Sequence, residues 1–246
     1  MAKDKDDNGE EPSRRGFLVS MAAIGGGVVA GGLVGKKVLG GASDAAAATV
    51  RPKTHDEIVA ALVEGNKRFG DGGSIHPNLD ATVRAAQAEK QTPWAAVLTC
   101  ADSRVGPEVI FDQGIGDLFV VRVAGNIATS DVVASLAYAV EHLGVSAIVV
   151  LGHEQCGAVK ATIETIENGS DPGEFKVLID AIRPAVKIDE GADAATTLHG
   201  AVAENVRLVT KGLPELSAII SERFYADELL IQPAVYDVKS GFVAML

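Results

Sequence analysis

Hydrophobic residues recur every three or four positions in several segments after residue 50, which is the spacing of helices with one buried face. The first segment follows a capping box at residues 54–57. A second begins at Ser130, which we expect to cap the helix, and ends before Gly144. A third begins near Cys156, and a fourth covers residues 196–211. The pattern therefore predicts helices in at least four places.

Shorter apolar runs lie between these helical segments. Residues 94–99, 119–123 and 147–151 are typical of strands buried in a sheet. Residues 229–236 and 242–246 predict two further strands, joined by a turn. Strands that alternate with helices in this way indicate an α/β fold, in which a mainly parallel central sheet is flanked by helices.

Composition narrows the class of protein. The chain has 246 residues, of which 47% are hydrophobic and 22% charged, and this excludes a disordered or collagen-like protein. The formal net charge is −11, which argues against a nucleic-acid partner and is compatible with a small-molecule substrate. Only two cysteines are present, so stability must come from a hydrophobic core rather than from a dense disulfide framework.

The first 48 residues differ from the rest of the chain. Polar residues at 1–12 precede the sequence Ser-Arg-Arg-Gly-Phe-Leu, and a Gly-rich apolar stretch follows. This resembles a twin-arginine export signal, and small residues at 45–48 offer a cleavage site. We expect a leader over residues 1–48, a single domain over 49–246, and export to the periplasm, the cell surface or the medium. Alternatively, residues 17–35 form a membrane anchor that persists if the leader is not cleaved; no stable membrane span is expected in the mature form.

Candidate chemistry lies directly after two of the predicted strands. Cys100, Asp102 and Arg104 follow the first strand, and His153 and Cys156 follow the third. Because ligands in open α/β sheets bind beyond the carboxyl ends of the strands, these side chains are expected to converge. Two thiolates and an imidazole suit zinc, and three protein ligands leave the fourth position for water. The sequence therefore predicts a catalytic zinc site.

Other interpretations of these residues stay open at this point. Cys100 and Cys156 could form a disulfide, or Asp102 could complete a closed structural zinc site as a fourth ligand. Asp102 and Arg104 could also form an ordinary surface ion pair. No metal role is expected for the four remaining histidines: His55, His76, His142 and His199.

Three segments resemble the β-class carbonic anhydrases: residues 100–104, 111–126 and 149–160. The likeness extends from about residue 57 to the C-terminus. It implies a β-carbonic-anhydrase-like fold with an N-terminal helical arm. It also implies a zinc-dependent lyase, with one zinc per chain, that reversibly hydrates CO2 to bicarbonate and a proton by attack of zinc-bound hydroxide. By this resemblance Cys100, His153 and Cys156 hold the metal, and Asp102 and Arg104 form a catalytic dyad beside it.

The resemblance also implies a substrate pocket. Gln91 would donate its amide to a substrate oxygen, Phe119 and Tyr138 would form an apolar wall, and the backbone N–H of Gly157 would be a further donor. Gln91 and the wall come from opposite subunits in the family, so a homodimer or higher homo-oligomer is implied. Two rival functions stay open: hydrolysis of carbonyl sulfide or carbon disulfide on the same scaffold, and catalytically silent binding of zinc or bicarbonate.

Overall fold

The computed structural model describes residues 51–188 and 191–246, so the predicted leader lies outside the described residues. Within this part of the chain, no helix is both long enough and apolar enough to cross a membrane.

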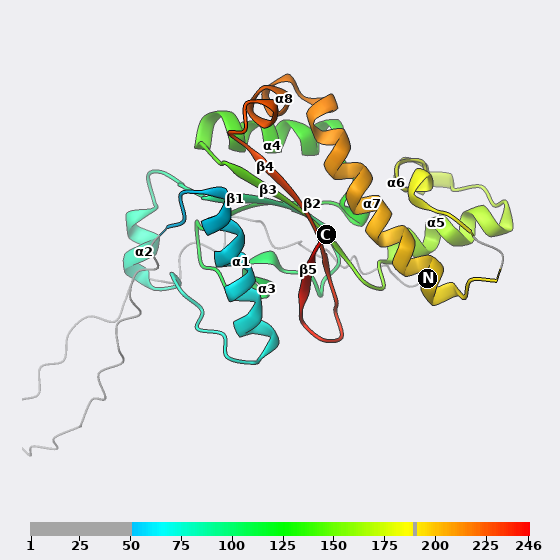
Figure 1. Cartoon of the computed structure of the whole chain (residues 1–246), viewed down its shortest axis with the longest axis horizontal. Helices are drawn as coiled ribbons and strands as arrows, with labels where there is room; N and C mark the ends of the chain where they lie inside the picture. Colours follow the sequence, from blue (N-terminus) through cyan, green and yellow to red (C-terminus); the bar gives the residue numbers. More distant parts are fainter. Residues whose placement is uncertain (1–50, 189–190) are drawn as a thin grey trace, which may run out of the picture. The chain divides into compact units, whose positions relative to one another are not determined.

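The helices and strands are connected mainly by short loops (Figure 1). In chain order, with η marking a short 3₁₀ helix, the elements are α1 (His55–Gly70), α2 (Ala81–Ala86), β1 (Ala95–Thr99), α3 (Pro107–Ile110), β2 (Leu118–Arg122), η2 (Ala124–Asn126), α4 (Ser130–Leu143), β3 (Ala147–His153), α5 (Gly157–Asn168), η3 (Gly173–Phe175), α6 (Lys176–Ile182), η4 (Arg183–Ala185), α7 (Ala194–Leu216), α8 (Ala218–Tyr225), β4 (Leu230–Tyr236) and β5 (Val243–Met245).

The five described strands form one sheet in the order β2-β1-β3-β4-β5. The neighbouring strands from β2 to β4 are parallel, and only β5 is antiparallel to its neighbour. Thr99, the last residue of β1, pairs with Arg122 of β2 and with Leu151 of β3. The carboxyl ends of the three strands therefore meet at one edge, and the predicted α/β fold with a mainly parallel sheet is confirmed.

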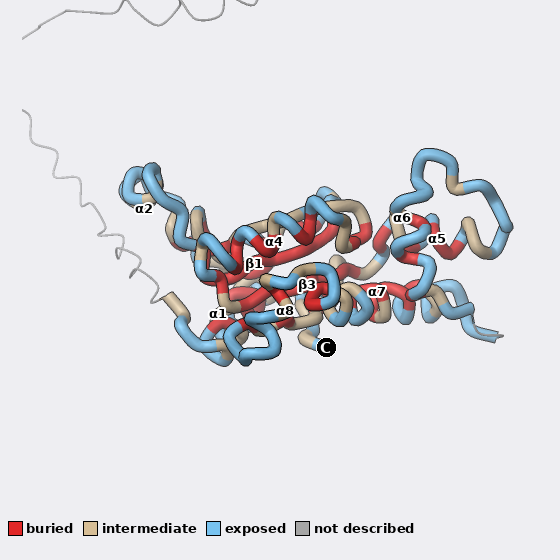
Figure 2. The backbone as a smooth tube through the Cα atoms, turned by 90° about the horizontal axis from the view of Figure 1, so that it is seen from above, coloured by how far each residue is buried: buried red, intermediate tan, exposed pale blue. Residues whose placement is uncertain are grey.

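Helices cover both faces of the sheet, which explains why its inner strands are continuously apolar. Ala96 and Leu98 of β1 face a core formed with α4, α7 and α8, whereas Ala95 and Val97 face a second core formed with α1 and α3. Every residue of β1 and β3 is buried. Figure 2 shows these buried stretches between helices whose outward surfaces are exposed.

The helix starts test two of the capping predictions. At α1 the capping box is confirmed, because the Thr54 side chain accepts from the Glu57 N–H and the Glu57 carboxylate accepts from the Thr54 N–H. At α4 the predicted cap is wrong by one residue: Thr129 is the N-cap and Ser130 is the first helical residue. Thr129 keeps an extended backbone, so the turn into the helix occurs one residue earlier than expected.

Candidate metal centre

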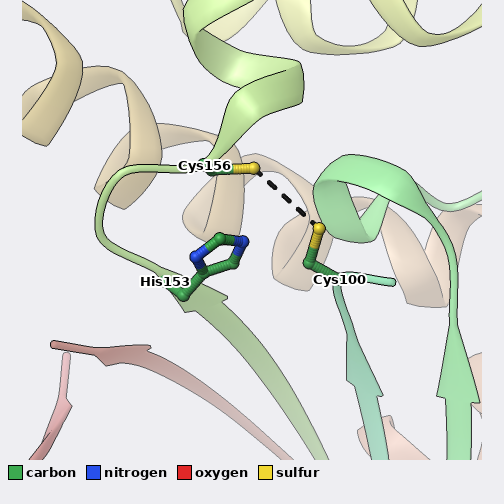
Figure 3. Close-up of side chains that lie close together, drawn as sticks. All are labelled: Cys100, His153 and Cys156. Carbon is green, nitrogen blue, oxygen red and sulfur yellow. Dashed lines mark hydrogen bonds between the residues drawn. The ribbon is translucent and has the colours of Figure 1, made fainter. Parts of the chain in front are cut away.

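Cys100, His153 and Cys156 are brought together at the carboxyl edge of the sheet (Figure 3). Cys100 directly follows β1, His153 is the last residue of β3, and Cys156 is the N-cap of α5. Because β1 and β3 are parallel neighbours, their ends place Cys100 beside His153. The tight turn from β3 into α5 then returns Cys156 to the same place.

The three side chains have the spacing of a metal site. Their ligand atoms all lie within 4.8 Å of one another, and all three residues are buried. The sulfurs of Cys100 and Cys156 are 4.0 Å apart. Two thiolates on one tetrahedral zinc would lie about 3.8 Å apart, whereas a disulfide would hold the sulfurs about 2 Å apart. Both cysteines are free, so the arrangement fits the metal interpretation rather than the disulfide.

The His153 ring is oriented to offer one nitrogen to a cation. Nδ1 lies 2.9 Å from the carbonyl oxygen of Glu154, and a carbonyl can only accept, so Nδ1 carries the proton. Nε2 is then the unprotonated nitrogen, and it is buried without a hydrogen-bond partner. A buried acceptor without a partner is unfavourable. A metal at Nε2 would remove this cost, because imidazole bound to metal typically donates its other N–H in this way.

The two thiols share their protons unequally. A hydrogen bond from the Cys156 thiol lowers the pKa of Cys100, and the backbone N–H of Gly125 also points at the Cys100 sulfur over 3.3 Å. The same bond, together with burial, raises the pKa of Cys156. The shared hydrogen bond therefore favours the thiolate form at Cys100 over the thiolate form at Cys156. A divalent cation would bind both sulfurs as thiolates and would displace any thiol proton.

Asp102 and Arg104 form an ion pair at the border of this cluster. Arg104 donates its Nε and its backbone N–H to Oδ1 of Asp102, each over 2.9 Å, and Nη2 to Oδ2 over 2.7 Å. These bonds hold the pKa of Asp102 well below its usual range. Oδ2 of Asp102 is 3.9 Å from Nε2 of His153, so the pair is not an isolated surface ion pair. The carboxylate is turned to Arg104 and is not part of the three-residue cluster.

The four residues that the resemblance implies for the substrate pocket do not all lie close together within one chain. The rings of Phe119 and Tyr138 lie 6.4 Å apart, but Phe119 pairs with Ala96, near the amino end of β1. Gln91 is exposed in the loop before β1, at the end of the strand opposite to Cys100. Gly157 is the first residue of α5 and has open space at its Cα. The substrate roles of these four residues stay predictions.

The remaining histidines lie outside the metal cluster: His55, His142 and His199 are on helices, and His76 is in a loop. Sequence reasoning missed Arg122, which donates Nε to the carbonyl of Cys100 over 3.1 Å and Nη2 to that of Asp102 over 2.6 Å. Arg122 is the last residue of β2, and this position at a strand end is the sequence signal that could have identified it. It also missed Gly125, whose positive φ of 69° and N–H bond to the Cys100 sulfur depend on tertiary packing.

A buried pair of cysteines and a histidine at the carboxyl edge of a parallel sheet is a set of donors that suits zinc. The family profile described as carbonic anhydrase matches residues 95–243. Carbonic anhydrase 2 of Mycobacterium tuberculosis is 40% identical over 182 residues, covering 74% of this chain and 87% of that protein. The carbonic anhydrase of Mycolicibacterium smegmatis is 37% identical over 186 residues, covering 75% of this chain and 90% of that protein.

Solved structures agree with the sequence relatives. The β-carbonic anhydrase CcaA matches with a TM-score of 0.60 at 28% identity, covering 76% of this chain and 87% of that one. The Coccomyxa β-carbonic anhydrase in complex with acetazolamide matches with a TM-score of 0.60 at 27% identity, covering 76% of this chain and 86% of that one. The chain belongs to the β-class carbonic anhydrase family.

Proposed function

We propose that this chain uses one zinc ion, held by Cys100, His153 and Cys156, to interconvert CO2 with bicarbonate and a proton. The observation that carries the proposal is the unpartnered Nε2 of His153 buried beside two free thiols. When bound, zinc supplies a water molecule of lowered pKa, and hence hydroxide at neutral pH. Family membership supports this chemistry, because β-class carbonic anhydrases are zinc enzymes.

We propose that Asp102 orients the nucleophile. Two thiolates and a neutral imidazole cancel the charge of a divalent cation, so neighbouring groups must help to stabilise hydroxide. The Asp102 carboxylate would accept a hydrogen bond from the nucleophile and so orient it toward CO2. Arg104 keeps that carboxylate ionised and in place. With zinc bound, the site would supply hydroxide for addition to CO2 to give bicarbonate, and the proton released from water would pass to solvent.

The proposed pocket requires a second copy of the chain. Gln91 precedes β1 and Cys100 follows it, so the whole length of this five-residue strand, about 16 Å, lies between them. Gln91 therefore cannot reach the metal cluster of its own chain as an amide donor. We propose a homodimer or larger homo-oligomer in which a second copy supplies Gln91, with Phe119 and Tyr138 as the apolar wall and the Gly157 N–H as a further donor.

We also propose that residues 1–48 direct export by the twin-arginine route. The support is the Arg14-Arg15 pair before a Gly-rich apolar stretch. Export of a folded protein would let Cys100 and Cys156 bind zinc in a reducing compartment before they meet oxidants. An uncleaved leader would instead leave the protein attached to the membrane.

The rival functions have less support. The relatives named above are carbonic anhydrases, which favours CO2 over carbonyl sulfide or carbon disulfide. Asp102 is bonded to Arg104 rather than placed among the ligands, which favours a catalytic site over a silent one. The test is to offer CO2, carbonyl sulfide and carbon disulfide to the same zinc-loaded preparation. Rapid hydration of CO2 is expected; turnover of a sulfur substrate without CO2 hydration would overturn the proposal.

A further inference from the structure

A single amide in the core connects helix α7 to the metal cluster. Asn205 lies on the buried face of α7, where its neighbours Val202 and Val206 are apolar. Burying an amide is unfavourable unless it is hydrogen-bonded. Nδ2 of Asn205 donates to the carbonyl oxygen of Gly125 over 2.9 Å, across 80 positions of sequence. This bond gives a polar residue on an apolar helix face a defined partner.

Gly125 in turn contacts the metal cluster directly. Its N–H lies 3.3 Å from the sulfur of Cys100. Its φ of 69° is in the left-handed region, and a Cβ there would lie 2.6 Å from Cδ1 of Ile182 and 3.2 Å from Cβ of Ala158. The left-handed backbone of one residue therefore directs the N–H toward the thiolate and the carbonyl toward Asn205.

We propose that Asn205 is a positioning residue for the metal centre, because it holds Gly125 so that the peptide N–H bonds to the Cys100 sulfur. The proposal rests on the proposed zinc function. A hydrogen bond to a thiolate withdraws electron density from the sulfur, so the cation keeps more of its charge. Asn205 touches neither the metal nor the substrate, and its effect passes through one backbone residue.

The test replaces the amide and observes the metal–sulfur bond itself. In Asn205→Leu the side chain keeps a similar size but loses its donor. Cobalt(II) serves as the spectroscopic probe, since thiolate-to-cobalt charge transfer absorbs in the near ultraviolet. Without the Gly125 hydrogen bond the sulfur is richer in electrons, so the band should move to longer wavelength. Competition with a chelator should show zinc bound about 10- to 100-fold more weakly, because the Cys100 thiolate loses the N–H that stabilises and orients it.

Asn66 provides a matched control. It is also a buried helix asparagine, and its Nδ2 donates to the carbonyls of Ile110 and Gly241 over 3.1 and 2.9 Å. It lies on α1, however, which packs against the core on the opposite face of the sheet. Asn66→Leu should lower stability without moving the cobalt band or the zinc affinity. If both variants shift the band equally, or if Asn205→Leu leaves band and affinity unchanged, the positioning role is wrong.

Two further results distinguish the proposals from each other. A wild-type protein that shows no thiolate-to-cobalt band would overturn the metal centre itself, and with it the role of Asn205. A wild-type band that is unchanged in the Asn205 variant would overturn the positioning role alone. If Asn205→Leu does not fold, Asn205→Ala, which removes the amide without adding bulk, decides by the same two measurements.

Discussion

Replacing Asp102 by Asn changes the charge of one group beside the metal cluster while leaving its size almost constant. Both carboxylate oxygens accept hydrogen bonds from Arg104: Oδ1 from Nε and the backbone N–H, and Oδ2 from Nη2. In Asp102→Asn, one oxygen becomes an NH2 group that cannot accept. Either the Arg104 bonds or the bond from the nucleophile must then lose an acceptor.

The size of the effect follows from the exposure of the pair. A hydrogen bond to a charged group contributes about 1.5 to 3 kcal/mol when it is shielded from water. The side chain of Asp102 is 17% exposed and that of Arg104 is 51% exposed, so water replaces part of the lost interaction and the lower end applies. A loss of about 1.4 kcal/mol in transition-state stabilisation is at least about a tenfold fall in kcat/KM.

The assay is stopped-flow CO2 hydration together with zinc analysis of the same samples. Asp102→Asn should retain zinc, because Cys100, His153 and Cys156 are unchanged, and should lose at least about nine-tenths of its activity. Asp71→Asn is the control. Asp71 forms an exposed ion pair with Lys67, 3.0 Å long, and neither residue belongs to the metal cluster. Full activity of Asp102→Asn with zinc bound would refute the orienting role of Asp102.

Three more predictions concern the ligands, the fold and the leader. Cys156→Ser should lose both zinc and CO2 hydration; metal analysis showing full zinc would remove Cys156 from the ligand set. Asp112→Asn should lower the free energy of unfolding by about 2 kcal/mol at pH 7. Burial alone would raise the pKa of Asp112, but bonds from Arg68 and two backbone N–H groups lower it overall, so its contribution is lost as pH falls below the ordinary value of 3.8. Urea unfolding should show that the free energies of unfolding of the wild type and of Asp112→Asn converge at acid pH. A difference that stays constant with pH would contradict this. Arg14→Lys with Arg15→Lys should leave a folded precursor in the cytoplasm, as cell fractionation would show, whereas normal export would contradict the leader assignment.

The edge of the sheet could be predicted from the sequence because local patterns determine it. The apolar runs ending at Thr99 and Leu151 marked two strand ends, and the parallel arrangement places such ends side by side. The sequence therefore predicts that Cys100 and His153 lie side by side. The third strand extends two residues further than predicted, to His153, since Gly152 and His153 pair with β4.

Other features depend on contacts that no local pattern encodes. The bond between Asn205 and Gly125 joins residues 80 positions apart, and an asparagine on an apolar helix face does not reveal its partner. The short helices α2 and α3 have six and four residues, which is too few for a helical period to emerge. Gln91 lies at the far end of β1 from Cys100, so its proposed role depends on a second chain.

The central claim is that CO2 hydration depends on zinc held by Cys100, His153 and Cys156. The most direct measurement is to remove the metal with a chelator, return zinc in steps, and follow CO2 hydration at each step between about pH 6.5 and pH 9. We predict that activity rises in proportion to bound zinc and reaches its maximum at about one zinc per chain. A metal-free protein that hydrates CO2 at the full rate, or a fully zinc-loaded protein that does not hydrate it, would contradict the account.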